Sequence, residues 1–286
     1  MRRFNLLLSF ILVALCLHAQ DELLDLLDDA SSDEYVSATF KSTRLINGHT
    51  AEIRSPKVLE FIIGHRFGRL NGGSQQAYGL DNATIRLGLE YGLAKNLNIG
   101  IGRASFQKTF DTFLKYRPIR QSDKSPVTVT AFGSVAYNSD RNFSFDEKSH
   151  RYDYTGQLLI ARKMNANLSL QLMPTMIYRP LVPTDDDDNT LIAMGMGGRY
   201  KVSNRVAINL EYYPQLTNYN EDRFDAVAFG VDIETGGHVF QLHFTNAEQM
   251  NEQGFIGETR DDISKTQLHF GFNISRVFDL GAKRRQ

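Results

Sequence analysis

The chain has 286 residues, a formal net charge of −1 and no long basic tract, which argues against a nucleic-acid partner. Phe (19) and Tyr (12) are frequent, Gly numbers 22, and there are only 7 Pro. A membrane β-barrel uses such residues in its aromatic belts and its closely packed lumen, although a soluble all-β protein uses them too.

The first 19 residues are typical of an export signal. Arg2 and Arg3 precede an apolar run from Leu6 to Leu17, and Ala19 is a small residue before Gln20. Removing this segment would remove Cys16, the single cysteine, so the mature chain would form no disulfide. No later apolar run approaches the roughly 18 residues that a transmembrane helix needs. We therefore expect export to the outer membrane of a Gram-negative bacterium.

Residues 20–55 form an acidic leader with two open questions. The leucines between Asp21 and Asp29 are compatible with one face of a short helix or with a flexible leader. The stretch from Tyr35 to Arg54 contains a turn-like Asn47-Gly48 pair. It is compatible with a short periplasmic segment, with a partial strand, or with a segment inside a lumen.

From Pro56 onward the sequence alternates with the period of two that a β-strand requires. In the clearest strand, Leu87 and Leu89 share one face while Arg86 and Glu90 share the other. A strand that separates lipid from a water-filled lumen has an apolar face opposite a charged one, as this pattern does. We predict about 12 strands, an even number as in closed antiparallel barrels. They are expected at Val58 to Phe67, Ala83 to Leu93, Leu97 to Phe106, Thr109 to Arg117, Val127 to Tyr137, Tyr152 to Ala161, Leu168 to Tyr178, Leu191 to Val202, Val206 to Tyr213, Phe224 to Glu234, His238 to Thr245 and Gln267 to Phe278.

The connections between these strands alternate between long and short, as in barrels with short periplasmic turns and longer outer loops. The brief link near Gln107 and the longer link from Ile119 to Ser125 depart from this pattern. Closure follows because an open sheet in hydrocarbon would leave two unpaired edges. The predicted fold is all-β: a closed antiparallel transmembrane β-barrel over residues 56–278, with a short N-terminal periplasmic segment and a short tail at 279–286.

The polar face of the strands predicts a lumen lined by both signs of charge. Such a lining suggests ion pairs in a narrow, partly blocked interior rather than a wide pore selective for one sign. The lumen-facing candidates are Arg86, Glu90, Asp111, Lys115, Arg117, Arg199, Lys201, Glu211, Asp232, Glu234, His243 and His269.

Motifs for catalysis or cofactors are weak. His243 and His269 would supply a base for acyl hydrolysis, but no nucleophile is tied to either by a recognisable motif. The acidic run from Asp185 to Asp188 lacks the spacing and the glycine of a calcium loop, so a solvated loop is the better interpretation. Glycines at 195, 197 and 198 lie inside a strand, which excludes a nucleotide loop. We expect no catalytic residue, no metal and no cofactor.

Several short sequence motifs, taken in their order along the chain, resemble an uncharacterised family of outer-membrane β-barrel proteins found in Bacteroidetes. These motifs are Lys41 to Gly48, His65 to Gly68, Gly79 to Asp81, Ile85 to Gly88 and Phe113 to Tyr116. The resemblance covers nearly all of the mature chain and implies a barrel location, but it brings no catalytic residues.

The leading functional expectation is a non-enzymatic outer-membrane barrel, either a narrow channel for small solutes or a structural and binding barrel. Its expected partners are outer-membrane lipids, the barrel-assembly machinery during insertion and an unknown small solute. Two alternatives stay open: an outer-membrane lipid hydrolase with a lumen or rim histidine, and a secreted soluble β-sandwich that binds a ligand.

Overall fold

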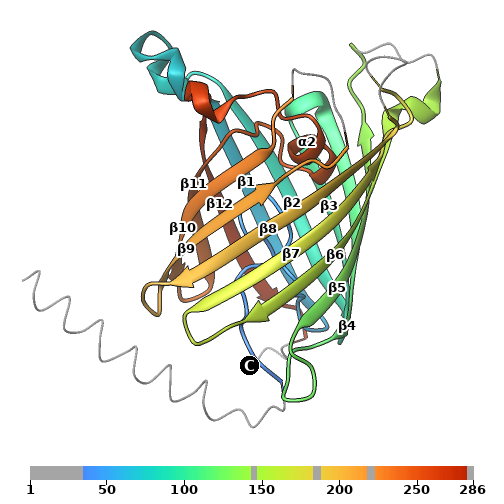
Figure 1. Ribbon diagram of the computed structural model, residues 1–286, viewed down its shortest axis with the longest axis vertical. Helices are drawn as coiled ribbons and strands as arrows, with labels where there is room; N and C mark the ends of the chain where they lie inside the picture. Colours follow the sequence, from blue (N-terminus) through green and yellow to red (C-terminus); the bar gives the residue numbers. More distant parts are fainter. Residues whose placement is uncertain (1–34, 143–146, 183–187, 218–222, 282–286) are drawn as a thin grey trace, which may run out of the picture. The chain divides into compact units, whose positions relative to one another are not determined.

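The computed structural model describes residues 35–142, 147–182, 188–217 and 223–281. Within them the chain forms a single antiparallel sheet that closes on itself (Figure 1). The predicted signal and the segment from Asp21 to Asp29 lie outside the described residues, as does most of the run from Asp185 to Asp188. Among the described residues, no helix combines the length and the apolar character needed to cross a bilayer.

Twelve strands are present in the described residues, and the predicted fold class is confirmed. The strands are β1 (Val58–Arg69), β2 (Ala83–Ala94), β3 (Leu97–Ala104), β4 (Thr109–Ile119), β5 (Thr128–Asn138), β6 (Tyr152–Lys163), β7 (Leu168–Tyr178), β8 (Thr190–Lys201), β9 (Val206–Tyr213), β10 (Ala226–Thr235), β11 (His238–Thr245) and β12 (His269–Asp279). The helices are α2 (Glu252–Gly257) and short 3-10 turns at Leu70–Gly72, Ser74–Gly79, Phe106–Lys108, Lys148–Arg151 and Ile263–Lys265.

The barrel closes between its first and last strands. β1 pairs with β12 from Val58 opposite Asp279 to Arg66 opposite Gly271, and β1 also pairs with β2 on its other side. Because every strand has two neighbours, the sheet has no free edge to expose unpaired backbone groups to lipid. The soluble β-sandwich alternative is therefore wrong.

The outer face of the barrel is apolar, as the period of two predicts. Along β2, Leu87 and Leu89 are more than two-fifths exposed, whereas Arg86 and Glu90 on either side of them are buried. The same alternation places Leu210 outward and Glu211 inward on β9. A wall of exposed aliphatic side chains this large is favourable only against an apolar solvent such as a bilayer.

The connections divide the barrel into a short-turn end and a long-loop end. Lys95 and Asn96 join β2 to β3 at the short-turn end, where β1 also begins and β12 ends. The two irregular links lie where the topology requires, with Ser105 to Lys108 at the long-loop end and Arg120 to Val127 at the short-turn end. The strands that flank them nevertheless form where they were predicted.

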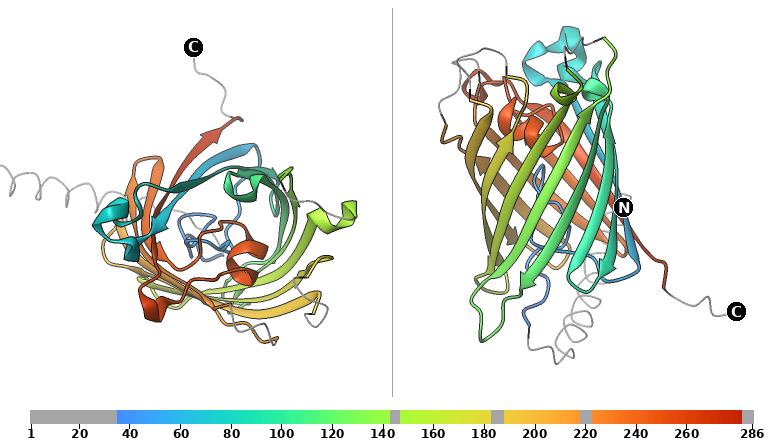
Figure 2. Two further views of the ribbon diagram at one scale, coloured as in Figure 1. Left: turned by 90° about the horizontal axis from the view of Figure 1, so that it is seen from above. Right: turned by 90° about the vertical axis from the view of Figure 1, so that its right-hand side faces the viewer.

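Two segments occupy the interior of the barrel. Residues 37–54, which we call the plug, and residues 246–259, which we call the lumen loop, lie inside the ring of strands when it is viewed from above (Figure 2). Three interpretations were open for the stretch from Tyr35 to Arg54, and the plug within it is a segment inside the lumen. The lumen loop carries α2, and all six residues of α2 are buried.

Candidate functional site

The plug contains a tight turn that reaches into the lumen. Arg44 and His49 form an antiparallel bridge, the Leu45 N–H donates to the Gly48 carbonyl at 2.9 Å, and the Thr50 N–H donates to the Thr43 carbonyl at 2.9 Å. The turn covers residues 45–48, with Ile46 and Asn47 at its centre, and neither Asn47 nor Gly48 takes the positive φ that an Asn-Gly hairpin turn requires. A Cβ atom on Gly48 would lie 1.9 Å from the Tyr213 hydroxyl, so only glycine fits there.

Glu211 on β9 holds the tip of the turn. Its carboxylate accepts hydrogen bonds from three consecutive backbone N–H groups, those of Ile46 (3.3 Å), Asn47 (2.6 Å) and Gly48 (3.2 Å). The carboxylate is buried, so these three donors supply the solvation that water would otherwise provide. Arg66 on β1 adds a bond of 2.6 Å from its Nη2 to the Asn47 side-chain oxygen.

Further side chains of the inner wall bind the main chain of the plug. Gln171 on β7 accepts from the Ala51 N–H and donates to the His49 carbonyl, both at 2.8 Å. Gln241 on β11 donates to the Leu45 carbonyl at 2.8 Å. Asn273 on β12 donates to the Ile46 carbonyl at 2.8 Å. Thr130 on β5 donates to the Ala51 carbonyl at 2.8 Å, and Lys115 on β4 donates to the Glu52 carbonyl.

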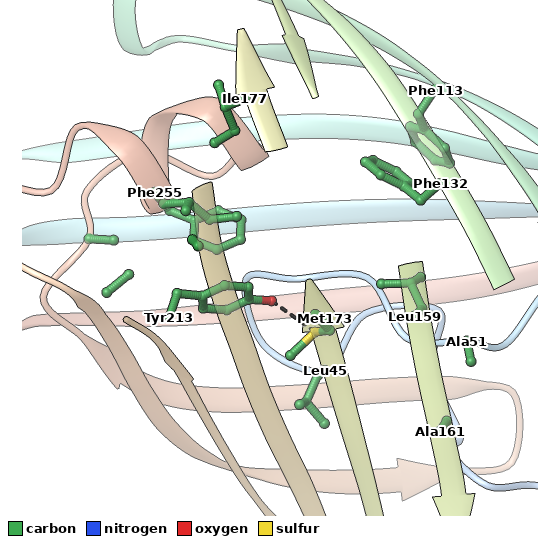
Figure 3. Close-up of a cluster of buried hydrophobic side chains, with 14 of the residues drawn as sticks. Leu45, Ala51, Phe113, Phe132, Leu159, Ala161, Met173, Ile177, Tyr213 and Phe255 are labelled. Carbon is green, nitrogen blue, oxygen red and sulfur yellow. Dashed lines mark hydrogen bonds between the residues drawn. The ribbon is translucent and has the colours of Figure 1, made fainter. Parts of the chain in front are cut away.

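One sector of the lumen is apolar, which the sequence analysis did not anticipate. Leu159, Met173, Ile177 and Leu191 on β6 to β8 point inward and are fully buried, and they form one cluster with Leu45 of the plug and Phe255 of α2 (Figure 3). The signal was present in the sequence, because the inward phase of these strands carries aliphatic residues between polar ones. The lumen therefore has a charged sector and an apolar sector.

The plug and the lumen loop meet at a buried ionic contact. Arg44 Nη1 lies 2.8 Å from Glu252 Oε1 of α2, and His49 Nε2 lies 3.6 Å from the same oxygen. The His49 ring packs against Phe113 and Phe132, with centroid distances of 4.4 and 4.5 Å. Burial and then the nearby Arg44 charge lower the pKa of His49 well below its usual value. Burial raises the pKa of Glu252.

The structure buries or half-buries every predicted lumen-facing residue, and it brings most of them into ion pairs. Arg86 pairs with Asp111, Lys115 lies 3.6 Å from Glu90, and Arg199 lies 3.2 Å from Glu234. Each of these pairs joins two strands separated by one other strand, so it runs along the wall rather than across the lumen. Other wall residues pair with the plug inside the lumen, as Arg117 does with Glu52 at 3.3 Å. Asp232 accepts from Gln241 at 2.9 Å, and Lys201 is half-buried near the short-turn end.

The two histidines proposed as a hydrolytic base lie in environments without the geometry of one. Both ring nitrogens of His269 are engaged, Nε2 with Asp261 at 2.6 Å and Nδ1 with the Phe67 carbonyl at 2.8 Å. His243 is fully buried beside Gly271, where an added Cβ would lie 2.5 Å from His243 Nε2. A general base needs a nitrogen within reach of a nucleophile and of substrate, and neither ring offers one.

A family model described as a membrane bound beta barrel domain (DUF5777) matches residues 40–278. The chain belongs to this family. The family resemblance inferred from the sequence is confirmed, while an origin in Bacteroidetes stays a prediction. The match to DUF5777 begins at Phe40, so the domain includes most of the plug as well as the barrel.

Solved structures with a similar fold include porins. The NanC porin is 11% identical, with 77% of this chain and 98% of that chain covered and a TM-score of 0.51. The KdgM porin is 10% identical, with 77% and 99% covered and a TM-score of 0.48. The Acinetobacter baumannii outer membrane protein Omp33 is 10% identical, with 77% and 97% covered and a TM-score of 0.41. At 11% identity the likeness to the NanC porin shows the fold alone. No curated protein matches the chain.

Proposed function

We propose that this member of DUF5777 is a non-enzymatic outer-membrane β-barrel that forms a narrow passage for small solutes, closed at rest by its plug and its lumen loop. The observation that carries the proposal is the polar inner wall, whose side chains bind a segment of the chain that is not part of the barrel. A wall needed only to support a barrel has no use for so many buried charges, because burying them is costly unless they are paired.

The contacts that hold the plug are of a kind that water can replace. A hydrogen bond between the wall and the plug contributes only about 0.5–1.5 kcal/mol net, since both groups bind water when they separate. Gln241 and Asn273 hold the tip through such bonds, while each bond to the Glu211 carboxylate contributes about 1.5–3 kcal/mol. The plug also packs Leu45 and Ala51 in the apolar sector. None of these contacts belongs to the hydrogen bonds of the sheet, so the plug is removable without unfolding the barrel.

The outer face supports the proposed location and the proposed lipid partners. The exposed aliphatic band requires a bilayer, and a strand-built barrel with one band of this kind suits the outer membrane, with its lipids as permanent partners. Export through the predicted signal and insertion by the barrel-assembly machinery are part of the same proposal.

The test is to expel the plug by one substitution that leaves the wall intact. Gly48→Val places side-chain atoms where the Tyr213 hydroxyl lies, so the tip of the turn loses its seat against Glu211. In planar bilayers, the wild-type protein should show no stable conductance, and Gly48→Val should show discrete single-channel steps.

The matched control is Gly156→Val on β6. This glycine faces outward, and nothing lies within 4 Å of an added Cβ, so the same change should leave the barrel closed. If Gly48→Val folds into the bilayer and conducts no more than Gly156→Val, the passage is refuted and a purely structural barrel is favoured.

A further inference from the structure

The inner wall of the lumen binds many main-chain groups of the plug, besides contacts with plug side chains such as Asn47 and Glu52. Six wall residues on six strands bind plug backbone atoms: Thr130, Lys115, Gln171, Glu211, Gln241 and Asn273. A buried segment must pair its N–H and C=O groups somewhere, and folded segments usually do so with other backbone. At the tip of the plug, side chains of the barrel do this instead.

The recognition covers both donors and acceptors of the peptide unit. Gln171 presents its amide to the plug as a neighbouring strand would, accepting from the Ala51 N–H and donating to the His49 carbonyl. Glu211 takes three convergent N–H groups, an arrangement that only a tight turn of polypeptide offers. Gln241 and Asn273 donate to the carbonyls of Leu45 and Ile46 in the same turn.

The apolar sector adds a tolerant surface beside these polar contacts. Leu45 and Ala51 of the plug pack in the cluster with Met173 and Leu159, where shape and apolar character matter more than sequence (Figure 3). Bonds to backbone atoms are indifferent to the side chains of the bound segment. The backbone contacts are thus suited to a short polypeptide other than the plug, while contacts with side chains such as Asn47 and Arg54 favour the plug itself.

We infer that the lumen vacated by the plug is a binding site for polypeptide main chain, and that short peptides able to form a tight turn are the class of solute the passage takes. The plug then acts as a resident peptide that occupies this site in the closed state. The identification of peptides as the solute rests on the proposed passage, whereas the binding site itself does not.

The experiment measures peptide binding to the full-length Gly48→Val protein in detergent by fluorescence anisotropy. Three labelled peptides are compared: the sequence of residues 40–52, a shuffled version that keeps the Asn-Gly pair, and the first peptide N-methylated at the positions of Ile46, Asn47 and Ala51. N-methylation removes the donors that Glu211 and Gln171 accept. The shuffled peptide keeps the backbone contacts but loses those of the plug side chains, so it should bind more weakly than the first peptide and more tightly than the methylated one. The methylated peptide should bind at least tenfold more weakly than the first.

Two further comparisons keep the result specific. Wild type, whose site is filled, should bind all three peptides at least tenfold more weakly than Gly48→Val does. Adding Glu211→Gln to Gly48→Val should weaken both unmethylated peptides tenfold. Should Gly48→Val fail to fold, Gly197→Val expels the plug from the wall side, because its Cβ would lie 2.4 Å from Leu45 Cδ2.

The inference is overturned if the shuffled peptide does not bind, if the methylated peptide binds as well as its parent, or if the opened barrel binds none of them. These outcomes are distinguishable from failure of the proposed passage, which would appear as absent conductance of Gly48→Val in planar bilayers. A barrel that binds peptides without conducting would retain the site and lose the transport role.

Discussion

His49 is a titratable side chain at the junction between the plug and the lumen loop, where it lies near Arg44 and Glu252. It lies between Phe113 and Phe132 and 3.6 Å from Glu252. Its pKa is lowered by burial and by Arg44, so the neutral ring is the form that the closed lumen holds. A released plug exposes the ring to water, where its pKa returns to about 6.5. The closed state is therefore fully favoured above pH 6.5 and is weakened below it.

Acid should open the wild-type barrel. Below pH 6.5 each further pH unit favours release of the plug by up to about tenfold, for as long as the buried ring stays neutral. Glu252 acts in the opposite sense, because burial raises its pKa and its protonation favours the closed state as the pH falls. Open probability in planar bilayers between pH 7.5 and 5 measures the sum.

His49→Gln separates the two contributions. Glutamine does not titrate, so this variant should retain only the effect of Glu252 and should not open as the pH falls. An acid response of equal size in wild type and in His49→Gln would show that His49 is not the group responsible.

At the scale of the element, each strand is a wall with two different faces. On β9, Ala207, Asn209 and Glu211 are buried inside, while Ile208 and Leu210 are at least half exposed outside. A charge on the outer face near the middle of a strand would stand in hydrocarbon. The depth of the position in the bilayer then sets the cost.

Leu210→Arg should lower the free energy of unfolding in lipid vesicles by about 2–4 kcal/mol, the cost of an arginine near the bilayer midplane. Leu216→Arg is the matched control, since Leu216 is similarly exposed but lies beyond the end of β9 at the long-loop end. It should cost at most about 1 kcal/mol. Guanidinium unfolding in vesicles measures both, and equal costs would contradict the predicted position of the membrane.

At the scale of the whole molecule, closure of the sheet couples all strands. The last strand to be made, β12, pairs with the first, β1, over most of its length, so no strand leaves without opening its two neighbours. The plug and the lumen loop add contacts from inside. Together they favour a barrel that resists local opening.

The folded protein should therefore keep its barrel in SDS at room temperature and migrate faster on a gel than the heated chain. Heating breaks the sheet and lets detergent extend the chain. Purified wild type, loaded with and without boiling, gives the comparison. Identical migration of the two samples, with folding verified by circular dichroism, would show that closure does not confer this resistance.

The alternation of residues was enough to predict the barrel. A period of two is imposed by the backbone itself, so Leu87 against Arg86 shows which face each side chain takes before any partner is known. Strand bounds, the even strand number and the charged lining follow from such local patterns. A turn near Asn47 and Gly48 was readable for the same reason, although neither residue takes the positive φ of an Asn-Gly hairpin turn.

Only the tertiary structure decided what fills the lumen. Glu211 is separated by more than 160 residues from the N–H groups it binds, and Arg44 by 208 residues from Glu252. No local pattern encodes such pairings, since they depend on which side chains face one another after closure. The same holds for the inward aliphatic residues of β6 to β8, because only the folded chain packs Leu45 and Phe255 against them. The sequence by itself determined a closed barrel with a polar inner face, and only the tertiary structure determined that segments of the same chain fill its lumen.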